Sequence, residues 1–507
     1  MSSPGATPAR RRWLSALFTH VPLALVLGAL GLAYAATMAP SITWANDGAD
    51  SGDLVAAAAV GGVAHPSGYP TFLLLARAFQ MLPLGDPALC TNILALSAAL
   101  VAAALTACVV SELCAGCGRY ARWAGALAAL ALGLSPVFWS QAIIAEVYSL
   151  NALFTASLAL FALRDARPGA IQGWTARARG LVAGMAMGNH LTIGLMLLGW
   201  IAAVAAGAPA GSRLRRVAAR LPWVGLGLLV YLYLPLRAAA QPPINWGDAD
   251  NLAGFWWTIS GMPYRRLAFG ISSELAPQRV MAWAALLLAQ FGPAGLVLGF
   301  GGLLYGGGAR RGVRYGSATI AVGYSLYALA YAADDSYAYM LPAYVIFAIW
   351  LGCGCGEIMA ALGRRRHMLA ALAALASVVL ISAPAPTTAA RVDARHDDRA
   401  IAFAGRVMTS APRGAIIVTS GDRDSFTLWY THYALGARPD LAVAVGPMLD
   451  FPWYRECMRG TYPWLNIPET SPEDWAAALG AANRTARVCI TQLDAPEVLI
   501  CAGRQGQ

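Results

Sequence analysis

Residues 44–53 read Trp44-Ala-Asn-Asp47-Gly-Ala-Asp50-Ser-Gly-Asp53, and after an Ala-rich run the chain continues as Gly61-Gly-Val-Ala-His65-Pro-Ser-Gly-Tyr69-Pro70. This loop follows the first hydrophobic segment and holds three carboxylates and a histidine. The chain as a whole is 58% hydrophobic and only 12% charged. Because unpaired charge beside lipid is costly, such a cluster at the mouth of a membrane span predicts a catalytic loop.

The 507 residues contain repeated apolar runs long enough, at about 20 residues, to cross a bilayer. This excludes a soluble core and predicts a polytopic α-helical membrane protein with about 11 transmembrane helices. The first 25 residues have the basic and apolar regions of a signal peptide, but the apolar run continues to Met38 without a cleavage motif, so we expect a retained first span. The expected spans are 19–39, 88–111, 122–138, 148–163, 180–188, 190–208, 221–236, 280–304, 316–332, 337–360 and 367–384.

The basic balance of the chain predicts its orientation in the membrane. The net charge of +10 comes from 36 basic residues, all of them Arg. With a cytoplasmic N-terminus, the cytoplasmic segments carry nineteen Arg and the outer segments before the tail carry five, which is a positive-inside bias. We therefore expect an integral protein of a bacterial-type inner or plasma membrane and no nucleic-acid partner. Residues 69–84 are too short to span, and we expect an interfacial or half-inserted helix there.

This topology places the polar residues that stand out in the sequence on one outer face of the membrane. They come from the first loop and from the outer ends of later spans. We therefore expect them to share a pocket, with catalytic candidates Asp50 and Asp53, and with substrate-binding candidates His65, Tyr69, Glu146, Tyr148, Asn189, His190, Arg237, Asp334 and Asp335.

The composition changes after Pro384 and Pro386, because the tail lacks a membrane-length apolar run. We expect a transmembrane domain over 1–386 and a small soluble extracytoplasmic α/β domain over 387–507. Short apolar runs predict strands at 415–419, 441–445 and 487–491, with a helix over 425–435. Cys457, Cys489 and Cys501 can include one disulfide if the tail is exported. The Cys114-x-x-Cys117 and Cys353-x-Cys355 pairs lack a second pair at zinc spacing and are expected to be small apolar residues.

Two blocks of the chain carry a family resemblance. The first is Asp50-Ser-Gly-Asp53 followed by Ala64-His65-Pro-Ser-Gly-Tyr-Pro70, and the second is Gly421-Asp422-Arg-Asp424-Ser-Phe426-Thr-Leu-Trp429-Tyr430 with Arg438-Pro-Asp440 and Pro452-Trp453-Tyr454. They resemble segments of a family of multispanning proteins long filed as a domain of unknown function. Its eukaryotic branch contains a protein O-mannosyltransferase, and the family is placed in the GT-C glycosyltransferase superfamily. The family more often has Glu where this chain has Asp53, and often a second Pro where it has Ser67.

The resemblance implies a function and its partners. GT-C enzymes take a sugar from a polyprenyl-phosphate carrier and pass it to an acceptor on the outer side, with an acidic residue of the first outer loop as catalytic base. The chemistry needs a carboxylate for the acceptor proton and positive charge for the departing phosphate. Asp50 is the first candidate for the base and Asp53 the second, whereas Asp47 is expected to solvate the loop. The sugar is mannose by analogy, and the acceptor is a protein Ser or Thr, a glycolipid or a cell-wall glycan.

Each candidate also has a structural alternative. Asp50 and Asp53 suit a helix N-terminus, where they would act as caps. His65 can be a structural hydrogen-bonding residue, and Tyr69 a turn residue, an interfacial anchor or a sugar platform. The remaining candidates at the outer helix ends either line the pocket or pair with another helix, and these are Glu146, Tyr148, Asn189 and His190.

The outer cations and the last acidic pair leave further alternatives open. Arg237 either holds the carrier phosphate through two parallel hydrogen bonds or snorkels to lipid headgroups. Arg265 and Arg266 are a second candidate for the phosphate. Asp334 and Asp335 either bind a divalent metal or acceptor hydroxyls, or are simply solvated. No cofactor is assigned from the sequence, and a divalent metal is one alternative.

A second function class is a non-enzymatic transporter or flippase of lipid-linked or small polar substrates. A transporter should carry ionisable residues near the middle of the membrane on broken helices, with repeats across its halves. In this chain the acids cluster at outer span ends, no repeats are visible, and a polar tail follows. The pattern favours the enzyme, and the short pair of spans around Asn189 is the main feature that fits the transporter.

Overall fold

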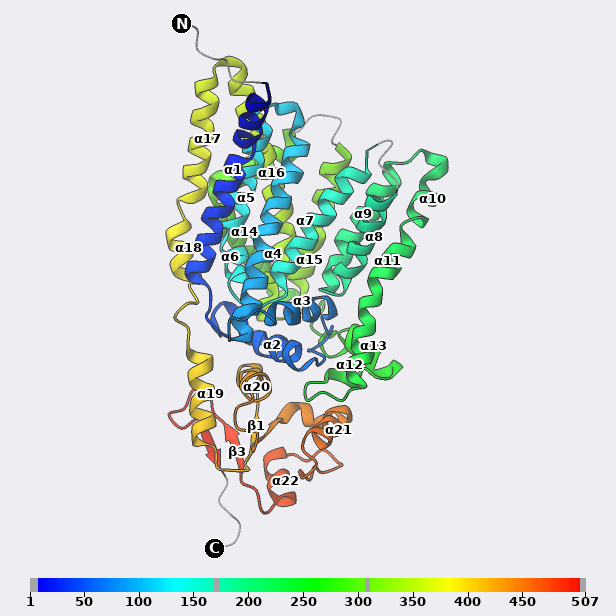
Figure 1. Ribbon diagram of the computed structural model, residues 1–507, viewed down its shortest axis with the longest axis vertical. Coiled ribbons are helices and arrows are strands. Elements are labelled where there is room, and N and C mark those ends of the chain that lie inside the picture. Colours follow the sequence, from blue (N-terminus) through cyan, green and yellow to red (C-terminus); the bar gives the residue numbers. More distant parts are fainter. Residues whose placement is uncertain (1–7, 168–172, 306–310, 502–507) are drawn as a thin grey trace.

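The computed structural model describes residues 8–167, 173–305 and 311–501. Figure 1 shows a helical bundle with a smaller α/β unit at one end. Glycines let neighbouring helices of the bundle approach closely, since a Cβ added to Gly302 would lie 1.9 Å from the carbonyl oxygen of Trp350. The bundle contains α1 (Pro8–Thr37), α4 (Pro87–Leu113), α5 (Tyr120–Gly133), α6 (Pro136–Ala142), α7 (Tyr148–Asp165), α8 (Trp174–Met187), α9 (Gly194–Ala206), α10 (Arg213–Ala218), α11 (Leu221–Leu228), α12 (Tyr233–Ala238), α14 (Ala276–Tyr305), α15 (Arg311–Ala330), α16 (Leu341–Arg365) and α17 (His367–Ser382).

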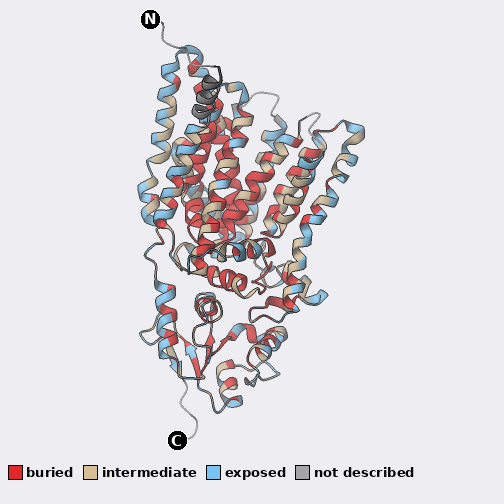
Figure 2. Ribbon diagram, viewed as in Figure 1, coloured by how far each residue is buried: buried red, intermediate tan, exposed pale blue. Residues whose placement is uncertain are grey.

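Every expected span overlaps one or more helices of the bundle. Within the described ranges, five helices are long and apolar enough to cross a membrane, or six if the bent pair α5 and α6 is one span. The integral membrane class is therefore borne out, whereas the count of eleven stays a prediction. Figure 2 shows buried residues concentrated in the centre of the bundle, with α17 and α11 largely exposed at its sides, as expected for helices that face lipid. Arg310, counted among the cytoplasmic arginines, lies outside the described residues.

One expected span differs from the structure in shape. Residues 122–138 were expected to form one span, and in the structure this segment is bent, because α5 ends at Gly133 and α6 starts at Pro136, at an angle of 74° to it. Ser135 adopts an extended conformation, because the residue before a proline is disfavoured in helical geometry. The turn brings the end of α6 toward the first loop, where the Gln141 amide donates a hydrogen bond to the Asn46 carbonyl at 3.3 Å.

Two short helices lie across the end of the bundle, beside the α/β unit (Figure 1). They are α2 (Ser51–Val60) and α3 (Pro70–Gln80). An α-helix of 11 residues is only about 16 Å long, so the expectation that residues 69–84 do not span the membrane is confirmed. All of α2 from Ser51 to Ala58 is buried, so Asp53 is enclosed, whereas Asp47 in the preceding turn is exposed.

The α/β unit follows α18 (Ala385–Val392), which continues the direction of α17. Its sheet has the order β2 (Ala442–Val445), β1 (Ile416–Thr419), β3 (Val488–Thr491) and β4 (Leu499–Cys501). The first three strands are parallel and match the three predicted strands, whereas β4 runs antiparallel to β3 and was not predicted. The remaining helices are α19 (Arg399–Ser410), α20 (Asp422–Trp429), α21 (Pro452–Thr461) and α22 (Trp475–Ala482), and the boundary expected at residue 386 falls within α18.

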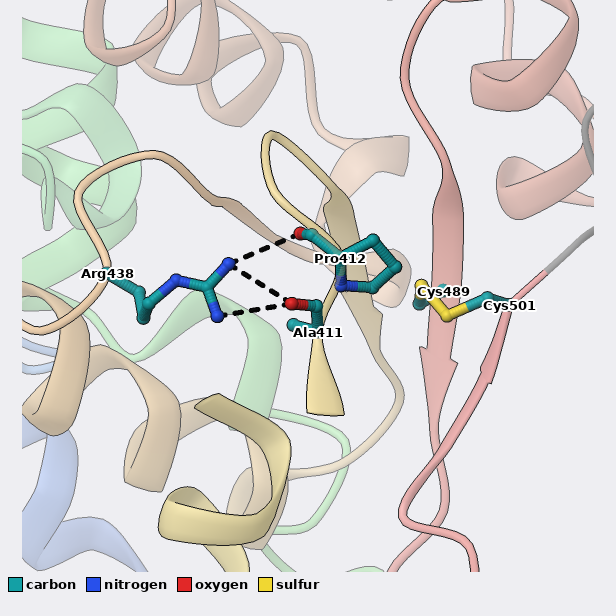
Figure 3. The surroundings of a disulfide bond; sticks show 5 residues. All are labelled: Ala411, Pro412, Arg438, Cys489 and Cys501. Atoms are coloured by element: carbon teal, nitrogen blue, oxygen red, sulfur yellow. Dashed lines mark hydrogen bonds between the residues drawn. A yellow bond between two sulfur atoms is a disulfide. The ribbon is translucent and has the colours of Figure 1, made fainter. Parts of the chain in front are cut away.

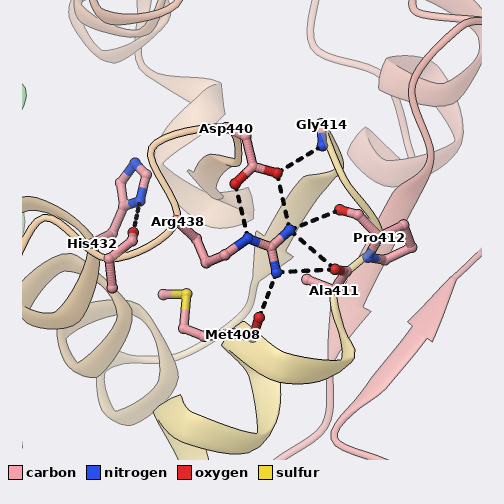
Figure 4. A network of polar contacts seen from close by, with 8 residues as sticks. Met408, Ala411, Pro412, Gly414, His432, Arg438 and Asp440 are labelled. Atoms are coloured by element: carbon pink, nitrogen blue, oxygen red, sulfur yellow. Dashed lines mark hydrogen bonds and ion pairs between the residues drawn. The ribbon is translucent and has the colours of Figure 1, made fainter.

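A disulfide and a network of hydrogen bonds stabilise this unit. Cys489 on β3 and Cys501 on β4 face each other in the sheet and form a disulfide (Figure 3), so the expectation of one disulfide in the tail is confirmed. Arg438 is the centre of the hydrogen-bond network (Figure 4). Its guanidinium pairs with Asp440 at 2.8 Å and donates hydrogen bonds to the carbonyls of Met408 and Ala411. Because planar guanidinium donors can satisfy several acceptors at once, this arginine ties the end of α19 to the start of β2.

The α/β unit is docked onto the first loop through Asp397. The Oδ2 atom of Asp397 accepts hydrogen bonds from the Thr43 hydroxyl at 2.5 Å and from the backbone N–H groups of Trp44 at 3.0 Å and Ala45 at 2.8 Å. Burial raises the pKa of Asp397, but the hydrogen bonds from Arg399, Thr43 and Ala45 outweigh it and lower the pKa to about 2. The ionised carboxylate therefore fixes the loop to the tail.

We expect Asp397→Asn to lower the stability of the protein near neutral pH by about 2 kcal/mol, because a lowered carboxyl pKa is a measure of native-state stabilisation. The stabilisation is present above a pH of about 4 and is lost as the pH falls toward 2. The midpoint of thermal unfolding in detergent, measured across this range, checks the expectation. Asp393→Asn removes an ion pair with the half-exposed Arg395 and serves as the control, with a much smaller effect. Equal shifts for the two variants would contradict the role of Asp397.

Candidate active site

The first loop places its acidic residues by an irregular turn followed by a helix. Asn46 and Asp47 both adopt left-handed conformations with φ of 57°, which asparagine and aspartate tolerate better than most residues. The turn ends at Asp50, where α2 begins. Because residues three apart share one face of a helix, Asp50 and Asp53 project on the same side.

Asp53 is a buried anchor whose two carboxylate oxygens are both engaged. The Oδ2 atom accepts hydrogen bonds from the backbone N–H of His65 at 2.9 Å and from its ring Nδ1–H at 2.7 Å. The Oδ1 atom accepts one from the indole N–H of Trp246 at 3.1 Å. Asp53 is 0% exposed, so its carboxylate serves the protein interior and does not reach open space.

His65 lies between the two acids of α2. Its Nε2 atom is 3.7 Å from Oδ2 of Asp50, while its Nδ1 atom is held by Asp53. The ring is stacked on Phe426 of the tail, with centroids 6.3 Å apart and an angle of 12° between the planes. Burial lowers the pKa of His65, but Asp50, Asp53 and Glu146 outweigh this and raise it to about 9. The imidazole is therefore positively charged at neutral pH.

Asp50 faces open space, in contrast to Asp53. Its side chain is 39% exposed, and it makes no capping hydrogen bond to α2. The helix-capping alternative is therefore wrong for Asp50. Enclosure by protein raises the pKa of the Asp50 carboxyl, His65 lowers it, and Asp335 and Asp53 raise it again, so that it lies above the usual value. A carboxylate with a raised pKa is a better proton acceptor near neutral pH.

Asp50 opens into a cavity of about 610 Å³ between the end of the bundle and the α/β unit. The wall combines carboxylates, arginines and a group of tyrosines. Enclosure raises the pKa of Asp422, on the tail side of this wall, and the nearby charge of Asp50 adds to the effect, to a value of about 6. The ionisable and aromatic residues of the wall are Asp47, Asp50, His65, Tyr69, Tyr148, His190, Tyr264, Arg265, Tyr327, Tyr331, Asp334, Asp335, Tyr339, Asp422, Arg423 and Phe426.

Two segments of the chain match one named family. Residues 50–208 match the protein O-mannosyl-transferase TMEM260 N-terminal domain, and residues 400–474 match TMEM260-associated domain 2. The mouse protein O-mannosyl-transferase TMEM260 is 28% identical over 464 residues, which cover 83% of this chain and 62% of the mouse protein. The Dictyostelium discoideum protein of that name is 25% identical over 292 residues, which cover 54% of this chain and 34% of the relative. The chain thus spans less than two thirds of the length of these curated relatives.

Solved structures give the fold. The oligosaccharyltransferase from Archaeoglobus fulgidus, in complex with Zn and sulfate, aligns with a TM-score of 0.53 and 13% identity over 83% of this chain and 62% of that one. ArnT from Cupriavidus metallidurans, bound to undecaprenyl phosphate, aligns with a TM-score of 0.55 and 12% identity over 90% of this chain and 96% of that one. The chain is therefore similar in sequence to protein O-mannosyl-transferase TMEM260 over these segments, and similar in fold to these two solved structures.

The structure brings seven of the expected site residues to one cavity wall, namely Asp50, His65, Tyr69, Tyr148, His190, Asp334 and Asp335. Four others lie elsewhere. Asp53 lies behind His65. Glu146 is 5% exposed, with one carboxylate oxygen that has no hydrogen-bond partner in the described part of the chain. The Asn189 amide donates to the Val147 carbonyl at 3.2 Å, so Asn189 supports the loop that carries Glu146.

Arg237 has a role that differs from both alternatives considered for it. Its Nε–H donates to the carbonyl of Gly61 at 2.5 Å. Gly61 ends α2 in a left-handed conformation, and cations at helix C-termini are favourable. Arg237 therefore caps α2 and is not part of the cavity wall, where the arginines are Arg265 and Arg423.

Several residues of the site were not singled out from the sequence. Asp422, Arg423 and Phe426 belong to α20 of the tail. In the sequence, the only indication of a role for them is that all three belong to residues 421–430, the second segment that carries the family resemblance. Trp246, the partner of Asp53, lies 193 residues away from it in the sequence and has no local signal. Asp424 of the same block is structural, since it accepts hydrogen bonds from Ser420, Gly421 and Thr491.

The acids of the wall do not form a recognisable metal centre. In residues 8–167, 173–305 and 311–501, no three His, Cys, Asp or Glu side chains are grouped so that they could hold a metal ion. Asp335 instead accepts a hydrogen bond from the Tyr148 hydroxyl at 3.3 Å, and Asp47 accepts one from Tyr337 at 2.7 Å.

Proposed function

We propose that this protein is a membrane glycosyltransferase that moves a hexose, mannose by analogy, from a polyprenyl-phosphate carrier to a hydroxyl group of an extracytoplasmic acceptor. The single observation that carries the proposal is the position of Asp50. Its carboxylate is exposed to a large cavity, and it lies next to His65, which is bound in turn by Asp53. The O-mannosyl-transferase names of the relatives and the undecaprenyl phosphate bound by ArnT support the choice of donor and sugar.

Asp50 acts as the general base of a single displacement in this proposal. The acceptor oxygen attacks the anomeric carbon, and its proton passes to the Asp50 carboxylate. A new bond forms between this oxygen and the sugar as the bond from the sugar to the phosphate oxygen breaks. The electron pair leaves with the polyprenyl phosphate, and the configuration at the anomeric carbon inverts.

Arg265 and Arg423 supply the positive charge that the departing phosphate requires. The tyrosines of the wall offer flat apolar faces and hydroxyl groups, which suit a hexose that must be both stacked and hydrogen-bonded. A protein Ser or Thr is the acceptor that we favour. The N-terminus is cytoplasmic and the tail extracytoplasmic, because the arginines concentrate at the ends of the bundle opposite the tail.

The deciding experiment uses the full-length protein in lipid nanodiscs with radiolabelled polyprenyl-phosphate mannose and a crude acceptor extract from the extracytoplasmic compartment. Transfer of label to the extract, with loss of labelled donor, is the expected result. Protease treatment and β-elimination of the product distinguish a Ser or Thr acceptor from a glycan. No transfer with any of several polyprenyl-phosphate hexoses, together with movement of labelled lipid across the bilayer of proteoliposomes, would replace the proposal by a flippase.

A further inference from the structure

The hydrogen bonds of Asp53 indicate that it acts through His65. Its carboxylate receives three hydrogen bonds, all from His65 and Trp246, and none of them comes from an N–H group of α2. It is fully buried, and it is not part of the cavity wall. A buried carboxylate is costly unless it is paired. The only ionisable partner that these contacts give it is the imidazole of His65.

His65 is held more firmly than a residue that only fills space would need to be. Both its backbone N–H and its ring Nδ1–H are bound to the same oxygen of Asp53. Tyr69 contacts the ring edge-on at 5.0 Å, Trp246 contacts it at 6.2 Å, and Phe426 stacks on its face. These contacts leave the ring with one open nitrogen, Nε2, and Asp50 is the carboxylate next to it.

We infer that His65 is a positioning residue for Asp50: held as an imidazolium by Asp53, it directs its Nε2–H toward one oxygen of Asp50, keeps that carboxylate ionised and leaves the other oxygen for the acceptor proton. The inference rests on the proposed function, since it assigns Asp50 a proton to accept. The chain of charges is negative, positive and negative from Asp53 to Asp50. A positive charge within about 4 to 6 Å of a carboxylate lowers its pKa by about 1 to 3 units.

The charges around His65 favour its protonated form. The charged and titratable groups that face it come from five parts of the chain, and they are Asp50, Asp53, Tyr69, Glu146, His190, Asp335 and Asp422. The acids among them favour the protonated ring. They also repel the negative charge of Asp50, because Asp335 and Asp53 both raise its pKa. Without the imidazolium, Asp50 would therefore take up a proton at a higher pH and cease to act as a base.

The test is the pH profile of kcat/KM for label transfer in His65→Gln. The acid limb of the profile reports the ionisation of the base. We expect this limb to move to higher pH by about one unit, so that the variant loses most activity at low pH and regains part of it at high pH. A purely structural role would lower kcat/KM equally at all pH values. His190→Gln, which removes another histidine of the wall, should leave the position of the acid limb unchanged, whatever it does to the rate.

Asp53→Asn tests the connection between the two residues. We expect it to move the acid limb in the same direction, and we expect this effect to disappear when His65 is already Gln, because residues that act as one unit are non-additive. Equal shifts in the two backgrounds would show that Asp53 acts independently, and would overturn the inference.

A spectroscopic measurement separates this inference from the proposed function. The protein has six histidines, and nitrogen-15 labelling of histidine in nanodiscs, with His65→Gln for assignment, reports the charge of the ring. We expect an imidazolium at pH 7 that titrates near pH 9. Two results overturn the inference alone, provided that the wild-type protein transfers sugar. The first is a neutral His65 at pH 7, and the second is an acid limb that lies at the same pH in His65→Gln as in the wild type. Absence of transfer by the wild type overturns the proposed function, and the role of His65 with it.

Discussion

Asp50→Asn is expected to reduce hexose transfer by about 10² to 10⁴-fold, the range typical of a lost general base. Asparagine has nearly the shape of aspartate but cannot accept the proton of an attacking hydroxyl group. The Asp50 carboxylate makes no hydrogen bond to the helix that it precedes, so the fold should tolerate the change. Initial rates of label transfer at saturating donor, together with the midpoint of thermal unfolding, check both parts of this expectation.

Asp250→Asn is the matched control for Asp50→Asn. Asp250 is an exposed acid in the loop that follows α12 and does not line the cavity, so its variant should transfer sugar at close to the wild-type rate. A fully active Asp50→Asn variant would exclude Asp50 as the base. Loss of activity in Asp53→Asn without a dependence on His65 would then transfer the assignment to Asp53.

Gly52→Ala is expected to lower transfer by about tenfold or more, although the substituted residue touches no substrate. A Cβ at Gly52 would lie 2.4 Å from the backbone oxygen of Phe426 and 2.5 Å from its carbonyl carbon. Backbone atoms cannot move aside as a side chain can, so α2 and α20 must separate. Overpacking of this kind costs about 1 to 3 kcal/mol. The separation also draws Phe426 away from His65 and Arg423 away from the cavity.

Gly405→Ala serves as the control for Gly52→Ala. Gly405 lies on α19 of the α/β unit, and nothing is within 4 Å of the position that its Cβ would take. That variant should be active and at least as stable as the wild type, because alanine favours helices over glycine. Transfer rates and thermal midpoints of the two variants are the measurement. Wild-type activity in Gly52→Ala would mean that the docking of α20 on α2 does not matter for the reaction.

The sequence predicted the parts of the site that depend on local patterns. The acids and histidine of residues 44–70 stood out because charge is scarce in this chain. The distribution of arginine placed the later loops on the same side as this one, and their residues do line one cavity. Strands β1, β2 and β3 were predicted because short apolar runs between turn residues are typical of buried parallel strands. The three residues of β4 are only half buried and give no such signal.

The different roles of Asp50 and Asp53 could not be predicted from the sequence. Two acids three residues apart on a helix share a face, but only the tertiary structure shows that one meets His65 and Trp246 in the interior while the other meets a cavity. The same limit applied to Arg237, since topology gives the side of the membrane but not the direction of a side chain. The contribution of α20 to the cavity depends on the fit of Gly52 against Phe426, which no local pattern encodes.

The docking of the tail has a consequence for how the molecule matures. Trp44 of the first loop donates a hydrogen bond to Thr427 of α20, and the two residues are 383 positions apart in the chain. Because a protein is synthesised from its N-terminus, the acidic loop emerges first, and its surroundings are complete only after α20 has been synthesised. In the proposed orientation, that segment must also cross the membrane. A nascent chain that lacks α20 would therefore hold its acids in water without the stacked ring of Phe426, and the finished geometry would arise only once α20 has been synthesised and exported.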